Sequence, residues 1–272
     1  MIDCGSGPPL VLVPGIQGRY EWMRPAIDAL AATTRVLSVS LAGEPRSGAR
    51  FDPSRGLDSF LEQIDAMVDR AGLAAVAVCG VSFGGLIALR YAATRPGRVR
   101  ALVLVSTPGP GWNLPDEMRP YLRHPWRRFP QFALGAIGRA AHELGGTFPG
   151  RRARMAAAAR WMALVATAPA SPARMAERAA LGGPSRQECA RIACPTLVVT
   201  GEPDLDRVVP VAATLEYARL IGGARTARLA RTGHLGLITR PEGFSEIVGG
   251  FVAEHACARS GWIDRSPVGA SS

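Results

Sequence analysis

The feature that most constrains the fold of this chain is an alternation of short apolar runs with segments of helical periodicity. Five runs rich in Val, Leu and Ala are bounded by Gly, Pro or polar residues, at residues 10–13, 35–41, 75–79, 99–105 and 196–200. Helical patterns follow the first three runs, at residues 21–31, 57–71 and 83–94. Continuous apolar runs of this length are typical of strands that are buried on both faces. The alternation therefore predicts an α/β fold with a mostly parallel central sheet and helices on both faces.

The alternation stops after residue 107 and resumes at residue 194. Residues 108–193 combine Pro/Gly-rich breaks with Arg- and Ala-rich helical stretches, so we predict a helical cap inserted between two parts of one core. The two parts of the core are then residues 1–107 and 194–258. Residues 259–272 show no periodic apolar pattern, and we expect them to form a flexible tail.

The net charge of +10 is concentrated in the predicted cap. Every one of the 32 basic residues is Arg, and residues 109–193 hold 13 Arg against 5 acidic residues. Aromatic residues make up only 6% of the chain and no zinc-finger or RNP-like pattern is present, so we expect no nucleic-acid partner. Two interpretations of the charge stay open, a solvated arginine surface and a cap that steers an anionic substrate.

Cysteine use and hydropathy argue against a metal site and a membrane span. The five Cys are odd in number, widely spaced and outside any Cys-x-x-Cys pattern, so we expect no metal, no cofactor and a cytoplasmic location. The N-terminal sequence MIDCGSGPP lacks the features of a signal peptide. The most apolar helical stretch, residues 155–168, is interrupted by Arg160 and is shorter than the roughly 20 residues that a membrane span needs.

The sequence Gly80-Val81-Ser82-Phe83-Gly84 carries the first chemical signal. It follows a predicted strand and precedes a predicted helix, which is the context in which a Gly-x-Ser-x-Gly pattern forms a nucleophile elbow. On such a sharp turn the residues two before and two after the serine approach so closely that only small side chains fit. Ser82 is therefore the candidate nucleophile, and Gly80 and Gly84 are structural residues of the turn.

A serine nucleophile needs a base within hydrogen-bond reach and a carboxylate that orients the base. His234 lies in a predicted loop between a strand predicted at residues 226–230 and a last helix predicted at residues 242–256. The other three histidines lie in the cap or near the C-terminus. In the sequence GEPDLD, which follows the strand at 196–200, Asp204 is the candidate acid and Asp206 could replace it. Ser82, Asp204 and His234 then come from three loops, each at the carboxyl end of a strand.

The chain resembles the α/β-hydrolase superfamily over essentially its whole length except the tail. The resemblance rests on GVSFGG, GEPDLDRVVP and GHLGLITRPEGF, which occur here in the superfamily's order of nucleophile, acid and base. It implies an α/β-hydrolase fold in which Ser82 is the nucleophile, Asp204 orients the base and His234 is the general base. It also implies a helical cap inserted after the sixth strand. Because this chain starts almost at the superfamily's first conserved turn, we expect a truncated N-terminal hairpin.

That first turn is the sequence LVPGIQG, which has Pro14 in place of the superfamily's usual His. Gly15 lets the chain bend close to a substrate. We expect an oxyanion hole made by the backbone N–H of Phe83 and by that of Ile16 or Gln17. Pro14 has no N–H, but the expected oxyanion donor is the N–H of Ile16 or Gln17, after Gly15. Pro in place of His is therefore compatible with an oxyanion hole.

These residues predict a serine hydrolase that cleaves a carboxylic ester, thioester or lactone of a small molecule through an acyl-enzyme on Ser82. Trp112 and His124, in the predicted cap, are candidates for lining the acyl pocket. Dehalogenase-like and epoxide-hydrolase-like members of the superfamily carry Asp at the elbow, so the resemblance, with Ser82 at that position, argues against those two chemistries. The basic cap argues against an aminopeptidase-like enzyme, which must bind an ammonium group.

Three alternatives stay open at this level. A C–C bond hydrolase or a cofactor-free haloperoxidase would use the same triad. A small-molecule receptor of the same fold would keep the triad without turnover. The Arg-rich segment could instead bind nucleic acid or an anionic membrane. The sequence does not indicate an oligomeric state.

Overall fold

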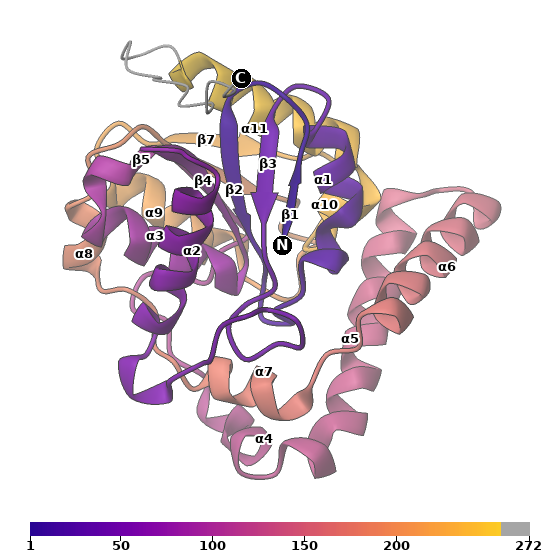
Figure 1. Cartoon of the computed structure of the whole chain (residues 1–272). Coiled ribbons are helices and arrows are strands. Elements are labelled where there is room, and N and C mark those ends of the chain that lie inside the picture. The colour runs from indigo at the N-terminus through magenta and orange to yellow at the C-terminus, as the bar shows by residue number, and fades with distance from the viewer. Residues whose placement is uncertain (257–272) are drawn as a thin grey trace, which may run out of the picture.

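The computed structural model describes residues 1–256, so the tail predicted at 259–272 lies outside the described residues. The strands are β1 (Ile2–Cys4), β2 (Pro9–Val13), β3 (Arg35–Ser38), β4 (Val76–Val81), β5 (Val99–Val105), β6 (Thr196–Thr200) and β7 (Arg225–Arg228). They form one sheet in the order β1-β3-β2-β4-β5-β6-β7 (Figure 1). β1 pairs with β3 in antiparallel fashion, and the other neighbouring strands are parallel. The predicted α/β fold with a mostly parallel sheet is confirmed.

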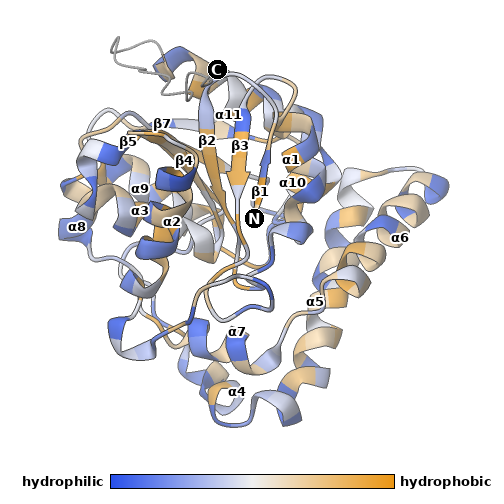
Figure 2. Ribbon diagram, viewed as in Figure 1, coloured by the Kyte–Doolittle hydropathy of each residue, from blue (hydrophilic) through white to orange (hydrophobic). Residues whose placement is uncertain are grey.

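Helices cover both faces of this sheet. They are α1 (Arg24–Leu30) and α11 (Pro241–Ala256) on one face, and α2 (Asp58–Arg70), α3 (Phe83–Thr94) and α9 (Val211–Leu220) on the other. Successive strand residues point to opposite faces, so Leu10 and Leu12 pack with α1 and α11. Val11 and Val13 pack with α2 and α3. The central strands are correspondingly apolar along their length (Figure 2).

Three details differ from the sequence-based expectations. The sequence does not predict β1, because this edge strand is only partly buried and has no apolar run. Within the described residues β1 is the single strand before β2, so the inserted segment follows β5, the fifth strand in chain order, and not the sixth. The helix expected at 21–31 starts as a 3-10 turn, Tyr20–Met23, and becomes α-helical at Arg24, because Pro25 suits the first turn of an α-helix.

The inserted segment is helical, as predicted. Its α-helices are α4 (Arg119–Arg123), α5 (Pro125–Thr147), α6 (Arg151–Thr167), α7 (Pro172–Ala179) and α8 (Arg186–Ala190). Helices α4, α5 and α7 contact one another and lie beyond the carboxyl ends of the central strands (Figure 1). α6 pairs with α5 and extends to one side of the molecule, whereas α8 contacts α3 and α9 of the core. We call helices α4 to α7 the cap.

A buried ion pair connects the cap to the core. Arg178 of α7 and Glu44, in the loop after β3, have side chains that are 2% and 0% exposed. The Arg178 Nη2 donates to Glu44 Oε1 over 2.7 Å, and the Arg174 Nε donates to the same oxygen over 2.9 Å. Burial lowers the pKa of Arg178, and the Glu44 carboxylate opposes that shift. The position of the cap therefore depends on a charged contact between residues 134 positions apart.

We expect Arg178→Met to lower the free energy of unfolding by about 3 kcal/mol, because it leaves the Glu44 carboxylate buried without its main partner. The double variant Arg178→Met/Glu44→Gln removes both charges and should lose clearly less. Urea denaturation measures both losses. Arg186→Met is the control, because Arg186 is 64% exposed and pairs with Glu216 at the surface. Equal losses for the single and double variants would contradict this account.

Candidate active site

Ser82 stands between β4 and α3 with φ 53° and ψ −122°, a strained backbone conformation for a residue with a side chain. Its N–H donates to Val105 O over 2.8 Å, and its carbonyl accepts from Gly85 N–H over 2.9 Å. A Cβ on Gly80 would overlap the carbonyl oxygen of Gly84 and lie 2.6 Å from the Cα of Gly85. The sharp turn expected at GVSFGG is therefore present, and backbone crowding explains its glycines.

The opening turn LVPGIQG lies directly beside this elbow. A Cβ on Gly84 would lie 2.5 Å from the carbonyl oxygen of Pro14, and a Cβ on Gly15 would lie 3.5 Å from the Cβ of Ser82. The Gly18 N–H donates to Gly15 O over 2.9 Å and closes the turn. The absence of side chains at positions 15 and 84 thus lets the opening turn approach the candidate nucleophile.

Replacing Gly80 by Ala should lower the free energy of unfolding by roughly 3 kcal/mol or more, because the new methyl group would meet main-chain atoms that cannot move away. Gly97→Ala is the matched control, since a Cβ there meets nothing within 4 Å, and we expect a change of less than about 1 kcal/mol. Thermal and urea unfolding measure both variants. Similar stability of the two proteins would refute the steric explanation of the elbow.

The backbone N–H groups expected as oxyanion donors, those of Phe83 and of Ile16 or Gln17, stay a prediction that the geometry of this turn allows. The Arg178 Nη1 donates to the carbonyl of Ile16 over 3.0 Å. Because the Ile16–Gln17 peptide is trans, its N–H points away from Arg178. Within the described part of the chain, neither the Ile16 N–H nor the Gln17 N–H donates to a protein acceptor. Phe83 begins α3, so its N–H lacks an intrahelical partner. All three groups remain candidates, and Arg178 orients one of them.

His234 is paired with a buried carboxylate. It follows β7 and precedes α10 (Gly236–Thr239), and its Nδ1 lies 3.3 Å from Asp206 Oδ2, with the two side chains 13% and 1% exposed. The other carboxylate oxygen of Asp206 accepts from the N–H groups of Val208 and Val209, each over 3.0 Å. Burial acts to raise the pKa of Asp206, but His234 and these two N–H groups outweigh it and lower the pKa. Asp206 is thus held as an anion against His234.

The choice of Asp204 as the partner of His234 is wrong. Its side chain is exposed, and its backbone carbonyl oxygen lies 2.9 Å from the Nε2 of His142. The N–H groups of Leu205 and Asp206 both donate to Glu202 O, over 3.1 and 3.0 Å. This tight turn places position 204 at its outer tip and directs position 206 inward. Asp206, the alternative predicted from the sequence, is the carboxylate next to His234.

Trp112 remains a candidate for the acyl pocket. It is half-buried and packs against the apolar cluster that contains Leu86. A Cβ on Gly183 would lie 3.3 Å from both Leu86 Cδ2 and the Cβ of Trp112, so the two side chains are near neighbours. Leu86 stands one helical turn after Ser82 on α3. The indole is therefore close to the helix that begins at the elbow.

His124 lies at the opposite end of α5 from the residue that contacts the His234 loop. It is exposed and precedes the first residue of α5, whereas Glu143, near the other end of α5, contacts the loop that carries His234. Nineteen residues of α-helix span about 28 Å. The long helix therefore carries His124 away from the loop of His234, and its role in lining the pocket stays a prediction.

Two buried charged residues of the cap contact the site, and the sequence does not single out either. Arg178 donates to the carbonyl of Ile16, and Glu143 accepts from the N–H groups of Gly233 and Leu235. Both lie in Arg/Ala-rich helices without a recognisable motif. Their roles depend on contacts between segments that are far apart in the sequence, which local patterns do not reveal.

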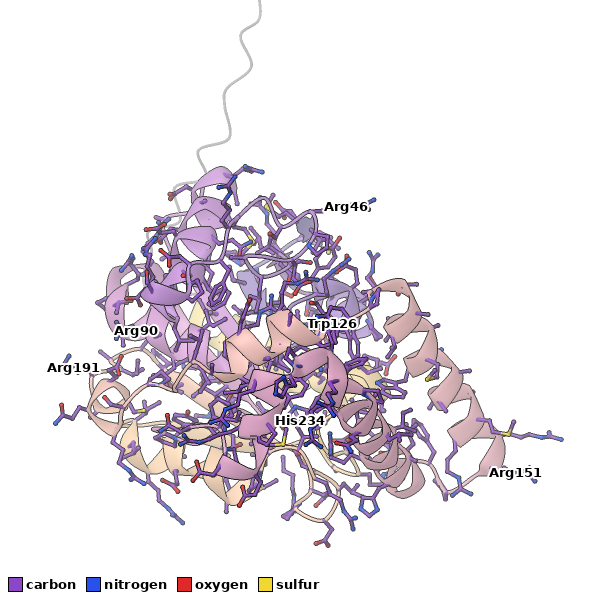
Figure 3. The ribbon with its side chains drawn as sticks, turned by 90° about the horizontal axis from the view of Figure 1, so that it is seen from below. Arg46, Arg90, Trp126, Arg151, Arg191 and His234 are labelled. Carbon is purple, nitrogen blue, oxygen red and sulfur yellow. The ribbon has the colours of Figure 1, made fainter. Side chains whose placement is uncertain are left out.

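The Arg residues that Figure 3 labels lie mostly at the outer edge of the molecule in this view. In this view, which looks at the cap from below, His234 lies near the middle while Arg46, Arg151 and Arg191 project outward. This arrangement favours a solvated arginine surface for these three residues. Among the helices of residues 1–256, none combines the length and the hydropathy that a membrane span requires.

Two further observations concern the side chains that could bind a metal or act as a second nucleophile. No group of three or more His, Cys, Asp or Glu side chains could hold a metal ion in the part of the chain that the structure describes. Cys79, two residues before Val81, is fully buried, and burial raises the pKa of its thiol. A neutral buried thiol is a poor nucleophile, which agrees with a packing role for Cys79.

The arrangement suits nucleophilic acyl transfer. Ser82 follows β4, Asp206 follows β6 and His234 follows β7, and these strands run parallel in one sheet. Their carboxyl ends therefore meet at one edge of the sheet, the edge that the cap overlies (Figure 1). An elbow serine, an imidazole and a buried carboxylate are the groups that such chemistry requires.

The sequence matches a known family model and several known proteins. The family model described as "alpha/beta hydrolase fold" matches residues 8–241. Over 266 residues the chain is 27% identical to 2-hydroxy-6-oxo-2,4-heptadienoate hydrolase of Pseudomonas putida, a match that covers 92% of this chain and 91% of that protein. Over 112 residues it is 35% identical to RutD of Azorhizobium caulinodans, which is described as a proposed carbamate hydrolase. This match spans 41% of the chain and 40% of that protein.

Among solved structures, the crystal structure of the enol-lactonase from Burkholderia xenovorans LB400 is similar. The match has a TM-score of 0.74 with 23% identity, and it covers 92% of this chain and 95% of that one. At this identity the likeness shows the fold alone.

Proposed function

Since this chain belongs to the α/β-hydrolase family, we propose that it is a serine hydrolase that cleaves a carboxylic ester, thioester or lactone of a small molecule. The observation that carries the proposal is the buried Asp206–His234 pair at the same sheet edge as the strained Ser82 elbow. An imidazole held by a carboxylate is suited to take a proton from a serine hydroxyl.

In the first step the Ser82 Oγ attacks the acyl carbon while His234 Nε2 takes the hydroxyl proton. Asp206, on Nδ1, fixes the ring and stabilises the imidazolium that forms. The tetrahedral oxyanion is bound by the N–H of Phe83 and by an N–H of the opening turn, at the start of a helix whose dipole favours negative charge. His234 returns the proton to the leaving alcohol or thiol, and the acyl-enzyme remains on Ser82.

In the second step a water molecule enters the position that the leaving group has vacated. His234 takes a proton from this water while the oxygen attacks the acyl carbon. As the second tetrahedral intermediate collapses, the bond between the acyl carbon and Ser82 Oγ breaks and His234 gives its proton to that oxygen, which releases the acid and the free serine. The substrate is an acyl compound small enough to fit between the cap and the sheet edge. Because Arg46, Arg151 and Arg191 project outward, they give no reason to expect an anionic substrate.

A C–C bond hydrolase is the second candidate. The observation that favours it is the 27% identity to 2-hydroxy-6-oxo-2,4-heptadienoate hydrolase over 92% of the chain. That chemistry can use the same three side chains, so the triad does not separate the two. Turnover of a vinylogous 1,5-diketone in the absence of any ester turnover would replace our proposal by this one.

Two aspartates two residues apart give a sharp test of the site. We expect Ser82→Ala to abolish hydrolysis of p-nitrophenyl acetate and Asp206→Asn to lower kcat about a thousandfold or more, because the base loses its orienting anion. Asp204→Asn makes the same chemical change on an exposed side chain and should keep kcat within about twofold. Steady-state kinetics of the three variants measure this. An inactive Asp204→Asn beside an active Asp206→Asn would reverse the assignment.

A further inference from the structure

We propose that Glu143, on cap helix α5, is a positioning residue for His234, so that docking of the cap onto the core completes the catalytic site. The inference rests on the proposed function, because it assigns Glu143 a role toward the proposed general base. Glu143 does not take part in the proton transfers described above. It acts on the backbone that carries the imidazole.

Glu143 accepts hydrogen bonds from the backbone of the two residues that flank His234 in the sequence. Its Oε1 accepts from the N–H of Gly233 over 2.7 Å and from the N–H of Leu235 over 2.9 Å, and its Oε2 accepts from Leu235 over 3.0 Å. Glu143 is only 2% exposed, so water does not compete for these hydrogen bonds. One carboxylate from the cap therefore fixes the peptide groups before and after the base.

The same turn of α5 also holds the loop that carries the acid. His142 Nε2 lies 2.9 Å from the carbonyl oxygen of Asp204. A Cβ on Gly146 would lie 3.2 Å from Leu205 Cδ1 and would overlap Leu205 Cδ2, so the helix backbone lies close to this loop. Residues three and four positions apart share a helix face, and this face of α5 thus contacts both the Asp206 loop and the His234 loop.

The two loops are also packed against each other. The Glu202 N–H donates to Thr232 O over 2.7 Å, and a Cβ on Gly233 would lie 2.5 Å from the carbonyl carbon of Leu205. A shift of Gly233 would therefore change the 3.3 Å separation between Asp206 and His234. That separation is longer than a strong charge-assisted hydrogen bond, so a small movement of either loop can break it.

Electrostatics adds to this geometric role. Burial raises the pKa of Glu143, while the N–H groups of Leu235 and Gly233 and the charge of His234 oppose the rise. The carboxylate is thus close enough to His234 for their charges to interact.

The first experiment compares kcat and KM of the full chain for p-nitrophenyl acetate. We expect Glu143→Gln to lower kcat about tenfold and Glu143→Ala about a hundredfold, with KM within about twofold, because the base is misplaced while the acyl site is kept. Gln retains one acceptor oxygen but presents an NH₂ group to Leu235 N–H. Glu117→Gln is the matched control, since Glu117 is an exposed acid of the same inserted segment, and it should be unchanged.

The second experiment observes the imidazole directly and needs no substrate. The chain has four His, so NMR spectra of protein labelled with ¹⁵N-histidine are simple, and His234→Ala assigns the His234 signals. In Glu143→Gln we expect the ring signals of His234 to shift and broaden while those of His255 stay in place. Glu117→Gln should leave all four unchanged.

The outcomes separate the two proposals. Folded Glu143 variants with wild-type kcat and an unchanged His234 spectrum would overturn the positioning role. A raised KM with unchanged kcat and spectrum would also overturn it, since it would show that Glu143 only supports the cap. If Ser82→Ala keeps wild-type turnover, the proposed function fails, and the His234 spectrum still decides whether Glu143 positions the imidazole.

Discussion

Backbone crowding at the elbow is the constraint on which the rest of the site depends. β4 turns into α3 within a single residue, and Ser82 takes a positive φ there. The turn is possible only because Gly80 and Gly84 leave room for main-chain atoms, including those of the opening turn. The same crowding that strains the serine therefore brings the N–H groups of Phe83 and LVPGIQG around it. The candidate nucleophile and the proposed oxyanion donors therefore depend on one steric requirement.

The cap contributes to this site through two buried charges. Arg178 reaches from α7 to the carbonyl of Ile16 and is neutralised by Glu44. Glu143 reaches from α5 to the peptide groups on either side of His234. One side chain thus supports the opening turn and the other supports the base loop. Buried charges are costly unless they are paired, and here each is paired with groups of the core, so cap docking and site geometry are coupled.

The sequence predicts the parts of this molecule that depend on local chemistry. The strand–helix alternation, the GVSFGG turn and the loop position of His234 follow from patterns a few residues long. The choice between Asp204 and Asp206 does not, because the dihedral angles of one tight turn decide which carboxylate faces inward. The exposed position of His124 and the contacts of Glu143 depend on how a 23-residue helix docks on distant loops. A short edge strand such as β1 has no apolar signal to detect.

The most direct test of acyl transfer at the elbow is to locate the covalent adduct by mass spectrometry. Cleavage after Arg releases residues 71–90, a peptide in which Ser82 is the sole hydroxyl-bearing side chain. After treatment with a fluorophosphonate, or after rapid acid quenching with a slowly hydrolysed ester, we predict that the adduct mass appears on this peptide at Ser82. An active protein whose adduct maps to another peptide, or that forms no adduct, would contradict the account.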